Sequence, residues 1–282
     1  MNNPKFEIVE ECFKGCKKLV QLSIPPFITK IGENAFKDCK FLREITIPFS
    51  VTSIECNAFE NCSLLKQITI PPSVTSIQNY TFSGCTLLAQ IHILSSVTSI
   101  GKKAFYECRS LEEINIPPSV TNIDEGAFEK CTSLRYIIIP SSVTLIARSA
   151  FAECEMLKNV YIPHSVIAIN ECAFSKCSSL EKIDIPNSVY SIGRSAFSLC
   201  TSLKEVTFEE PPVITLIDSC AFEDCSSLSE IVIPLSIKII GMYAFGGCKS
   251  LAPFEISPDI GQGIFSERQR YPFNRGRQCN IF

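Results

Sequence analysis

Polar and apolar residues alternate in short stretches that recur along the whole chain. One of these stretches is Lys66-Gln67-Ile68-Thr69-Ile70-Pro71, in which the alternation ends at the proline. Alternation with a period of two is typical of a half-buried β-strand, because successive side chains point to opposite faces. The pattern therefore places Ile68 and Ile70 inward and Gln67 and Thr69 outward.

The residues that follow this predicted strand complete one structural unit. Pro71-Pro72-Ser73 predicts a turn, and residues 74–77 predict a second, shorter extended segment. Residues 79–85 then predict about one helical turn, which carries Phe82 and Cys85 on a single inner face. One such unit cannot bury its apolar face by itself.

The unit repeats along most of the chain. Phenylalanine recurs every 23 residues from 13 to 197, and again at 222 and 245 after steps of 25 and 23. A cysteine follows each of these phenylalanines after three residues, and a leucine follows after six. Eleven stacked units at the usual inter-strand spacing predict a solenoid roughly 50 Å long with one continuous core.

The spacing Leu-x-x-Ile-x-Ile matches the leucine-rich repeat pattern. Residues 31–53, which read IGENAFKDCKFLREITIPFSVTS, closely resemble the BspA-like (Treponema pallidum type) leucine-rich repeats, and the resemblance extends over residues 8 to about 260. It implies a right-handed leucine-rich repeat solenoid of eleven 23-residue coils. A parallel β-sheet is expected on the concave face, with short second strands and one-turn helices opposite. The resemblance also implies binding, commonly adhesion to host or extracellular-matrix proteins, rather than catalysis.

Two features depart from the usual repeat. Serine stands at Ser50, Ser73 and Ser119, where asparagine usually caps the strand. The unit of 25 residues contains Glu209-Glu210-Pro211-Pro212, which we expect to bulge as a loop. Residues 1–260 are therefore predicted to form the solenoid, and residues 261–282 to form a separate basic tail.

Eleven cysteines in register raise three interpretations: a metal stack, a disulfide ladder, or buried thiols packed beneath the phenylalanines. Paired Cys-x-x-Cys knuckles are lacking, the number is odd, and no secretory signal precedes them. Buried thiols are therefore the favoured interpretation. Four further cysteines, Cys12, Cys56, Cys172 and Cys220, lie off this ladder and are expected to be partly exposed.

The remaining composition argues against catalysis and against nucleic-acid binding. The chain has two histidines, His92 and His164, and neither is placed with a nucleophile and an acid in the manner of a catalytic triad. The net charge is −3, and no apolar run approaches the roughly 18 residues of a membrane span. We therefore predict no enzyme, no cofactor, no metal site and no nucleic-acid partner.

The outward strand positions are predicted to form the binding surface for a protein ligand. Most of them are small or polar, but Tyr136, Ile138 and Tyr161 come from adjacent coils and predict one exposed apolar patch. Asn159 and His92 complete the predicted set of partner-binding residues. The alternative is that these side chains only stabilise the sheet by packing against their cross-strand neighbours.

The C-terminal tail predicts attachment to a membrane. Its last four residues, Cys279-Asn280-Ile281-Phe282, fit a prenylation box in which Cys279 would carry the lipid. Asn280 is not aliphatic and weakens the match, whereas Ile281 fits. The tail has a net charge of +3, with four arginines expected to bind anionic lipid: Arg268, Arg270, Arg275 and Arg277.

These features lead to two hypotheses for the whole protein. The first is a lipid-anchored plasma-membrane protein of adhesion or surface-antigen type that binds a host or extracellular-matrix protein. The second is a cytosolic scaffold for protein partners, since prenylation takes place in the cytosol. The short stretch before Ile8 leaves the first coil open to strand pairing, so either a weak homodimer through this coil or fraying of the coil is also predicted.

Overall fold

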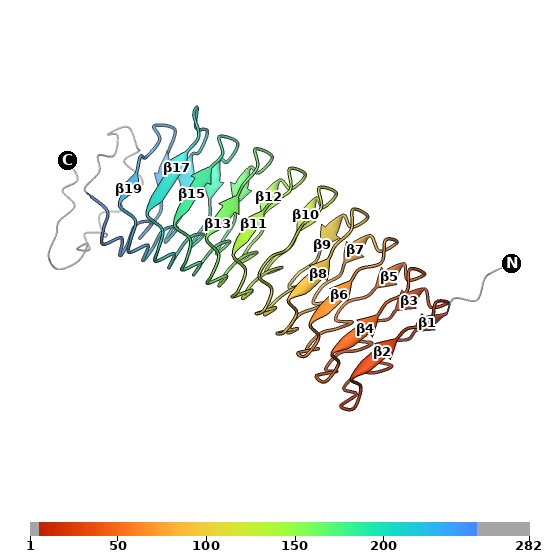
Figure 1. Ribbon diagram of the computed structural model, residues 1–282. Coiled ribbons are helices and arrows are strands. Elements are labelled where there is room, and N and C mark those ends of the chain that lie inside the picture. Colours follow the sequence, from red (N-terminus) through yellow and green to blue (C-terminus); the bar gives the residue numbers. More distant parts are fainter. Residues whose placement is uncertain (1–5, 253–282) are drawn as a thin grey trace.

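The computed structural model describes residues 6–252, which form a curved stack of coils (Figure 1). Most coils contain a strand of two to four residues that begins the coil, a tight turn, a second strand of two residues and a six-residue turn; the first set is called the longer strands here. The longer strands are β2 (Gln21–Ser23), β4 (Glu44–Thr46), β6 (Gln67–Thr69), β8 (Gln90–His92), β11 (Tyr136–Ile138), β13 (Asn159–Tyr161), β15 (Lys182–Ile185), β17 (Glu205–Phe208) and β19 (Glu230–Ile231). The shorter strands are β1 (Glu7–Ile8), β3 (Lys30–Ile31), β5 (Ser53–Ile54), β7 (Ser76–Ile77), β9 (Ser99–Ile100), β10 (Asn122–Ile123), β12 (Leu145–Ile146), β14 (Ala168–Ile169), β16 (Ser191–Ile192), β18 (Leu216–Ile217) and β20 (Ile239–Ile240).

All strand pairs are parallel, and the register follows the sequence repeat. Tyr136 pairs with Asn159, 23 residues on, whereas Glu205 pairs with Glu230 because the intervening coil has 25 residues. The longer strands form the sheets β2-β4, β6-β8, β11-β13 and β15-β17-β19, together called the long-strand face here. Residues 113–115 form no strand, yet Ile114 remains buried like its equivalents. The predicted leucine-rich repeat solenoid is confirmed.

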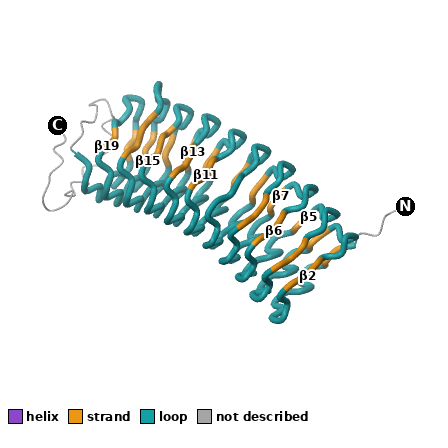
Figure 2. Tube along the Cα trace, in the orientation of Figure 1, coloured by secondary structure: helices purple, strands orange, loops and turns teal. Residues whose placement is uncertain are grey.

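The predicted one-turn helices are wrong, because residues 6–252 contain turns in their place (Figure 2). The N–H groups of Asn34, Phe36 and Asp38 donate to carbonyls of the next coil at 2.8–3.1 Å. The N–H groups of the residues between them fold back to the carbonyl three residues earlier. Asn34 and Asp38 have φ values of 54° and 60°, in the left-handed region that interrupts a right-handed helix. Every second N–H therefore links one coil to the next.

The repeated phenylalanines form one stack through the core. Adjacent rings lie 5.1–5.6 Å apart between centroids and are nearly parallel, with interplanar angles of 1–14°. Eleven phenylalanines belong to the stack, from Phe13 to Phe245, and nine of them are fully buried. The strand of the eleventh repeat would follow Leu251, so the described residues make about ten complete turns.

The ladder cysteines lie beside this stack as free thiols. Ten of them are buried: Cys39, Cys62, Cys85, Cys108, Cys131, Cys154, Cys177, Cys200, Cys225 and Cys248. Each thiol donates to the carbonyl of the phenylalanine in the preceding coil, as Cys62 Sγ does to Phe36 O at 3.2 Å. The buried-thiol interpretation is confirmed. Off the ladder, Cys12 is exposed, and Cys56, Cys172 and Cys220 are partly exposed, as expected.

Two of the serines that stand where asparagine is usual, Ser50 and Ser119, also donate hydrogen bonds to the preceding coil. Ser50 Oγ donates to Ile28 O, and Ser119 Oγ donates to Val97 O, both at 2.6 Å. Each hydroxyl thereby satisfies a carbonyl of the preceding coil, and this bond connects neighbouring coils rather than capping a strand.

The first coil is folded onto the second. Ile8 is buried, β1 pairs with β3, and Phe13 stacks on Phe36 at 5.1 Å. This finding argues against the predicted fraying of coil 1, whereas the homodimer stays a prediction. No helix within residues 6–252 has the length and apolarity to cross a membrane. Cys279 and the four tail arginines lie outside the described residues.

Candidate functional site

Four of the five predicted partner-binding residues meet on two adjacent strands of the long-strand face. In the β11–β13 pair, Tyr136 lies opposite Asn159, and Ile138 lies opposite Tyr161. Tyr136, Ile138 and Tyr161 are 42%, 60% and 58% exposed, although each is a large apolar or aromatic side chain. We call these four residues the aromatic patch.

The patch is anchored on one side by a hydrogen bond. Tyr136 Oη donates to Glu113 Oε2 at 2.9 Å, and this hydrogen bond raises the pKa of the tyrosine above its ordinary value. The bond orients the ring while leaving much of its face open. The fifth predicted residue, His92, pairs with Thr69 in β6–β8. Two repeats separate it from Ile138, so the structure does not bring it into the patch.

A cavity that the sequence pattern did not predict adjoins the patch. It has a volume of about 410 Å³, and its lining includes Tyr161, His164, Asp184, Phe208 and Glu209. Glu209 Oε2 lies 3.2 Å from His164 Nδ1 and accepts the Asn187 N–H at 3.3 Å. The two extra residues of the 25-residue unit therefore make a loop, as predicted, and the start of this loop folds back over the two preceding coils.

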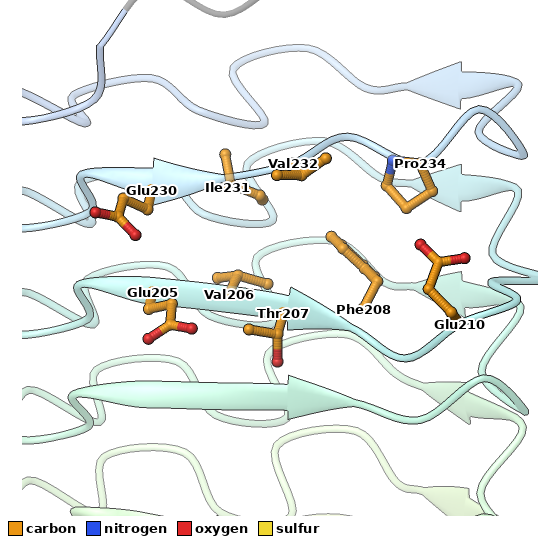
Figure 3. A pocket seen from close by; sticks show the side chains of 9 residues that line it. All are labelled: Glu205, Val206, Thr207, Phe208, Glu210, Glu230, Ile231, Val232 and Pro234. Atoms are coloured by element: carbon orange, nitrogen blue, oxygen red, sulfur yellow. The ribbon is translucent and has the colours of Figure 1, made fainter.

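A second cavity, of about 320 Å³, lies on the other side of Phe208 between β17 and β19 (Figure 3). Figure 3 shows the carboxylates of Glu205 and Glu230 at one end, that of Glu210 at the other, and Phe208 and Val232 between them. Glu205 forms an ion pair with Lys182 at 3.1 Å. Within residues 6–252, Glu210 and Glu230 form no ion pair with a cationic side chain. We call this cavity the acidic groove.

The groove exists because one repeat departs from the pattern. Phe208 stands where the other complete units have isoleucine, and Glu209 stands where all of them but one have the strand-ending proline. Phe208 is only partly buried, and the Ser236 hydroxyl, one coil further on, is buried without a hydrogen-bond partner. The ladder of serine bonds is thus interrupted next to the inserted loop. The 25-residue spacing was the sequence signal of this interruption, although it did not indicate the groove itself.

The side chains of the aromatic patch and of the two cavities are of kinds that suit contact with a binding partner. Its side chains are aromatic, aliphatic and carboxylate groups, which suit apolar contact and charge pairing. No group of three or more metal-ligating side chains occurs within residues 6–252. Burial raises the pKa of the ladder thiols, to about 11 for Cys39 and about 12 for Cys200, so they are protonated and unreactive at neutral pH.

Known proteins share both the repeat and the fold. The model of the BspA type leucine-rich repeat region, with six copies, matches residues 6–135 and 121–252. A leucine-rich repeat protein from Bacteroides ovatus is 31% identical, with a TM-score of 0.64 over 84% of this chain and 75% of that one. One from Eubacterium ventriosum is 23% identical, with a TM-score of 0.55 over 90% and 82% of the two chains.

A further similar structure is described as a leucine rich cell surface protein, from Faecalibacterium prausnitzii. It is 25% identical, with a TM-score of 0.50, and the match covers 88% of this chain and 82% of that one. No curated protein sequence matches the chain. The family model covers nearly all described residues, so the chain belongs to the BspA-type leucine-rich repeat family.

Proposed function

We propose that this protein is a non-enzymatic binding protein that holds a protein partner on its long-strand face. The observation that carries the proposal is the aromatic patch, in which three large side chains from two paired strands are exposed together. Exposed aromatic residues that cluster on a rigid surface are enriched among binding hot spots. Leucine-rich repeat solenoids serve in general as scaffolds for protein interaction, which supports the same conclusion.

The finer proposal is an adhesion or surface-antigen role at the plasma membrane, with a host or extracellular-matrix protein as partner. Two observations support it: the similar Faecalibacterium prausnitzii protein is described as a cell surface protein, and residues 279–282 fit a prenylation box, although Asn280 departs from it, with four arginines before them. The rival is a cytosolic scaffold, which is favoured by the cytosolic location of prenylation. Biotinylation of intact cells separates the two, because only an outward-facing protein is labelled.

Replacing Tyr136 and Tyr161 together, Tyr136→Ala and Tyr161→Ala, should abolish binding to immobilised extracellular-matrix proteins. Both rings are exposed, so their loss removes contact area while the core stays intact. The urea midpoint should change little. Surface plasmon resonance and urea unfolding are the measurements.

Tyr190→Ala is the matched control, because Tyr190 is 49% exposed but precedes β16, away from the long-strand face. It should bind as the unchanged protein does. Equal affinity of the double variant and the unchanged protein would exclude the patch, and failure of the unchanged protein to bind would exclude matrix proteins as partners.

Cys279→Ser should move the protein from the membrane fraction to the soluble fraction of the cell. One prenyl chain gives only reversible attachment, to which basic residues add about 1 kcal/mol each near an anionic leaflet. Replacing Arg268, Arg270, Arg275 and Arg277 by glutamine should therefore give partial, salt-sensitive release. Cys12→Ser is the control and should leave fractionation unchanged. Membrane fractionation that is unaffected by Cys279→Ser would rule out the lipid anchor.

A further inference from the structure

The acidic groove has the composition of a surface that is normally covered. Its centre is apolar, and Val232 is 83% exposed, among the most exposed large apolar side chains of residues 6–252. Glu210 and Glu230 lie at opposite ends of it, and neither forms an ion pair within those residues. In contrast, Glu181 pairs with Lys204 and Glu153 pairs with Lys176 on nearby coils. A complementary occupant needs two cations separated by apolar groups.

One segment of this chain has that composition. Arg270-Tyr271-Pro272-Phe273-Asn274-Arg275 places an arginine on each side of two aromatic rings and a proline. The proline favours an extended conformation for the residue before it. In the groove, Glu230 and Pro234 are four residues apart, which is about 13 Å along an extended chain. Two arginines five residues apart in an extended segment span a similar length of about 16 Å.

We propose that residues 268–277 of this chain dock in the acidic groove between β17 and β19. The arginines pair with Glu210 and Glu230, and the aromatic rings cover Phe208 and Val232. The arrangement is an intramolecular interface that uses charge complementarity at its ends and apolar contact at its centre.

The tail starts close enough to reach the groove. Leu251 holds the same place in its repeat as Leu228, so Ala252 lies one coil beyond the start of β19. Neighbouring coils are close, since the rings of Phe222 and Phe245 are 5.5 Å apart. The 15 residues from 253 to 267 can span roughly 50 Å when extended. A tether of this kind gives an effective concentration in the millimolar range, so individually weak ion pairs suffice.

Docking and membrane binding then compete for the same arginines. In solution the tail covers the groove, whereas an anionic leaflet that binds the tail exposes Phe208, Val232 and the two carboxylates. This competition rests on the proposed membrane role of the tail, whereas the docking itself does not. The groove would be open to a partner only where the protein is at a membrane.

Photocrosslinking of the full chain tests the docking. Tyr271 is replaced by p-benzoylphenylalanine, the purified protein is irradiated, and mass spectrometry locates the crosslinks. We expect intramolecular crosslinks to residues 205–234. Glu210→Gln together with Glu230→Gln should lower their yield about fivefold or more, since two exposed ion pairs are lost. Raising the salt concentration from about 0.05 M to 0.5 M should act in the same direction.

Glu44→Gln is the matched control, because Glu44 occupies in β4 the same place in the repeat that Glu230 occupies in β19. It should leave the yield unchanged. Crosslinks elsewhere on the solenoid, products only between two chains, or a yield that ignores both the glutamine substitutions and salt would overturn the docking. Phosphatidylserine vesicles should lower the yield, and a constant yield while the protein binds vesicles would overturn the competition alone.

Discussion

Raising the pH from 8 to about 10.5 should unfold this protein completely, in the presence of a reductant that prevents cysteine oxidation. Ten ladder thiols are buried, and burial raises the pKa of each: to about 11 for Cys39, about 12 for Cys200 and Cys248, and higher still for others such as Cys131. In the unfolded chain a thiol loses its proton near pH 8.5. Unfolding therefore releases protons above that pH, and the free energy of unfolding falls as the pH rises.

The size of this effect follows from proton linkage. Each thiol that is protonated in the folded state and ionised in the unfolded state lowers the free energy of unfolding by about 1.4 kcal/mol per pH unit. Ten such thiols give a slope of roughly 14 kcal/mol per pH unit between about pH 9.5 and 11. A typical domain is stable by only about 5–15 kcal/mol, so about one pH unit is enough. Urea unfolding at a series of pH values measures the slope.

The control separates the ladder from other groups that titrate in this range. Cys131→Ala together with Cys154→Ala should reduce the slope by about 3 kcal/mol per pH unit, because two linked protons are removed. Cys12→Ala together with Cys56→Ala changes the same number of cysteines at exposed or partly exposed positions and should leave the slope unchanged. A urea midpoint that is the same at pH 8 and pH 10.5 would contradict the linkage.

Replacing Phe128 by alanine should lower the free energy of unfolding by about 3–5 kcal/mol. The ring is fully buried and stacks on both neighbours, with centroids 5.2 Å from Phe105 and 5.4 Å from Phe151. Its removal leaves a cavity in the middle of the stack and cuts the packing between two halves of the solenoid. Because each coil of a solenoid is supported by its neighbours, the unfolding transition should also lose cooperativity.

Phe49→Ala is the matched control for Phe128→Ala. Phe49 is 76% exposed, so the same substitution should change the stability by no more than about 0.5 kcal/mol. Urea unfolding followed by circular dichroism gives both values. Equal losses for the two variants would show that the phenylalanine stack is not a main source of stability.

Sequence spacing was sufficient to predict the coil and its core. Three sequence patterns indicate which side chains are buried: the 23-residue period, the alternation in stretches such as residues 66–71, and the Phe-x-x-Cys spacing. The structure buries nearly all the side chains that these patterns place inward. The conformation of the six-residue turns was not predictable in this way. Their left-handed positions hold residues as different as Asn34, Tyr80 and Lys103. Every second hydrogen bond that maintains this conformation is made with the adjacent coil, which the local sequence does not specify.

For the candidate site too, the sequence predicted one part and not the other. Tyr136, Ile138, Asn159 and Tyr161 could be grouped because strand register follows directly from the repeat. The acidic groove could not be located, because it depends on the direction in which an inserted loop folds. Glu209 folds back toward His164 and Asn187 through contacts that no periodic pattern contains. The spacing of 25 indicated an interruption but not its shape.

The alternating hydrogen bonds of the six-residue turns make the length of this molecule adjustable in whole units. Phe105, Phe128 and Phe151 present equivalent donors and acceptors to their neighbours, so one 23-residue coil of this kind can follow another. Removing residues 106–128 as a block would join Phe105 to Glu129 in the same frame, and the ladders would close again. The molecule would become shorter by one ring spacing of about 5 Å, whereas a deletion of only part of a repeat would take ladder residues such as Phe128 out of register. Duplication of the gene segment that encodes one 23-residue repeat can therefore lengthen this protein in fixed steps of one coil.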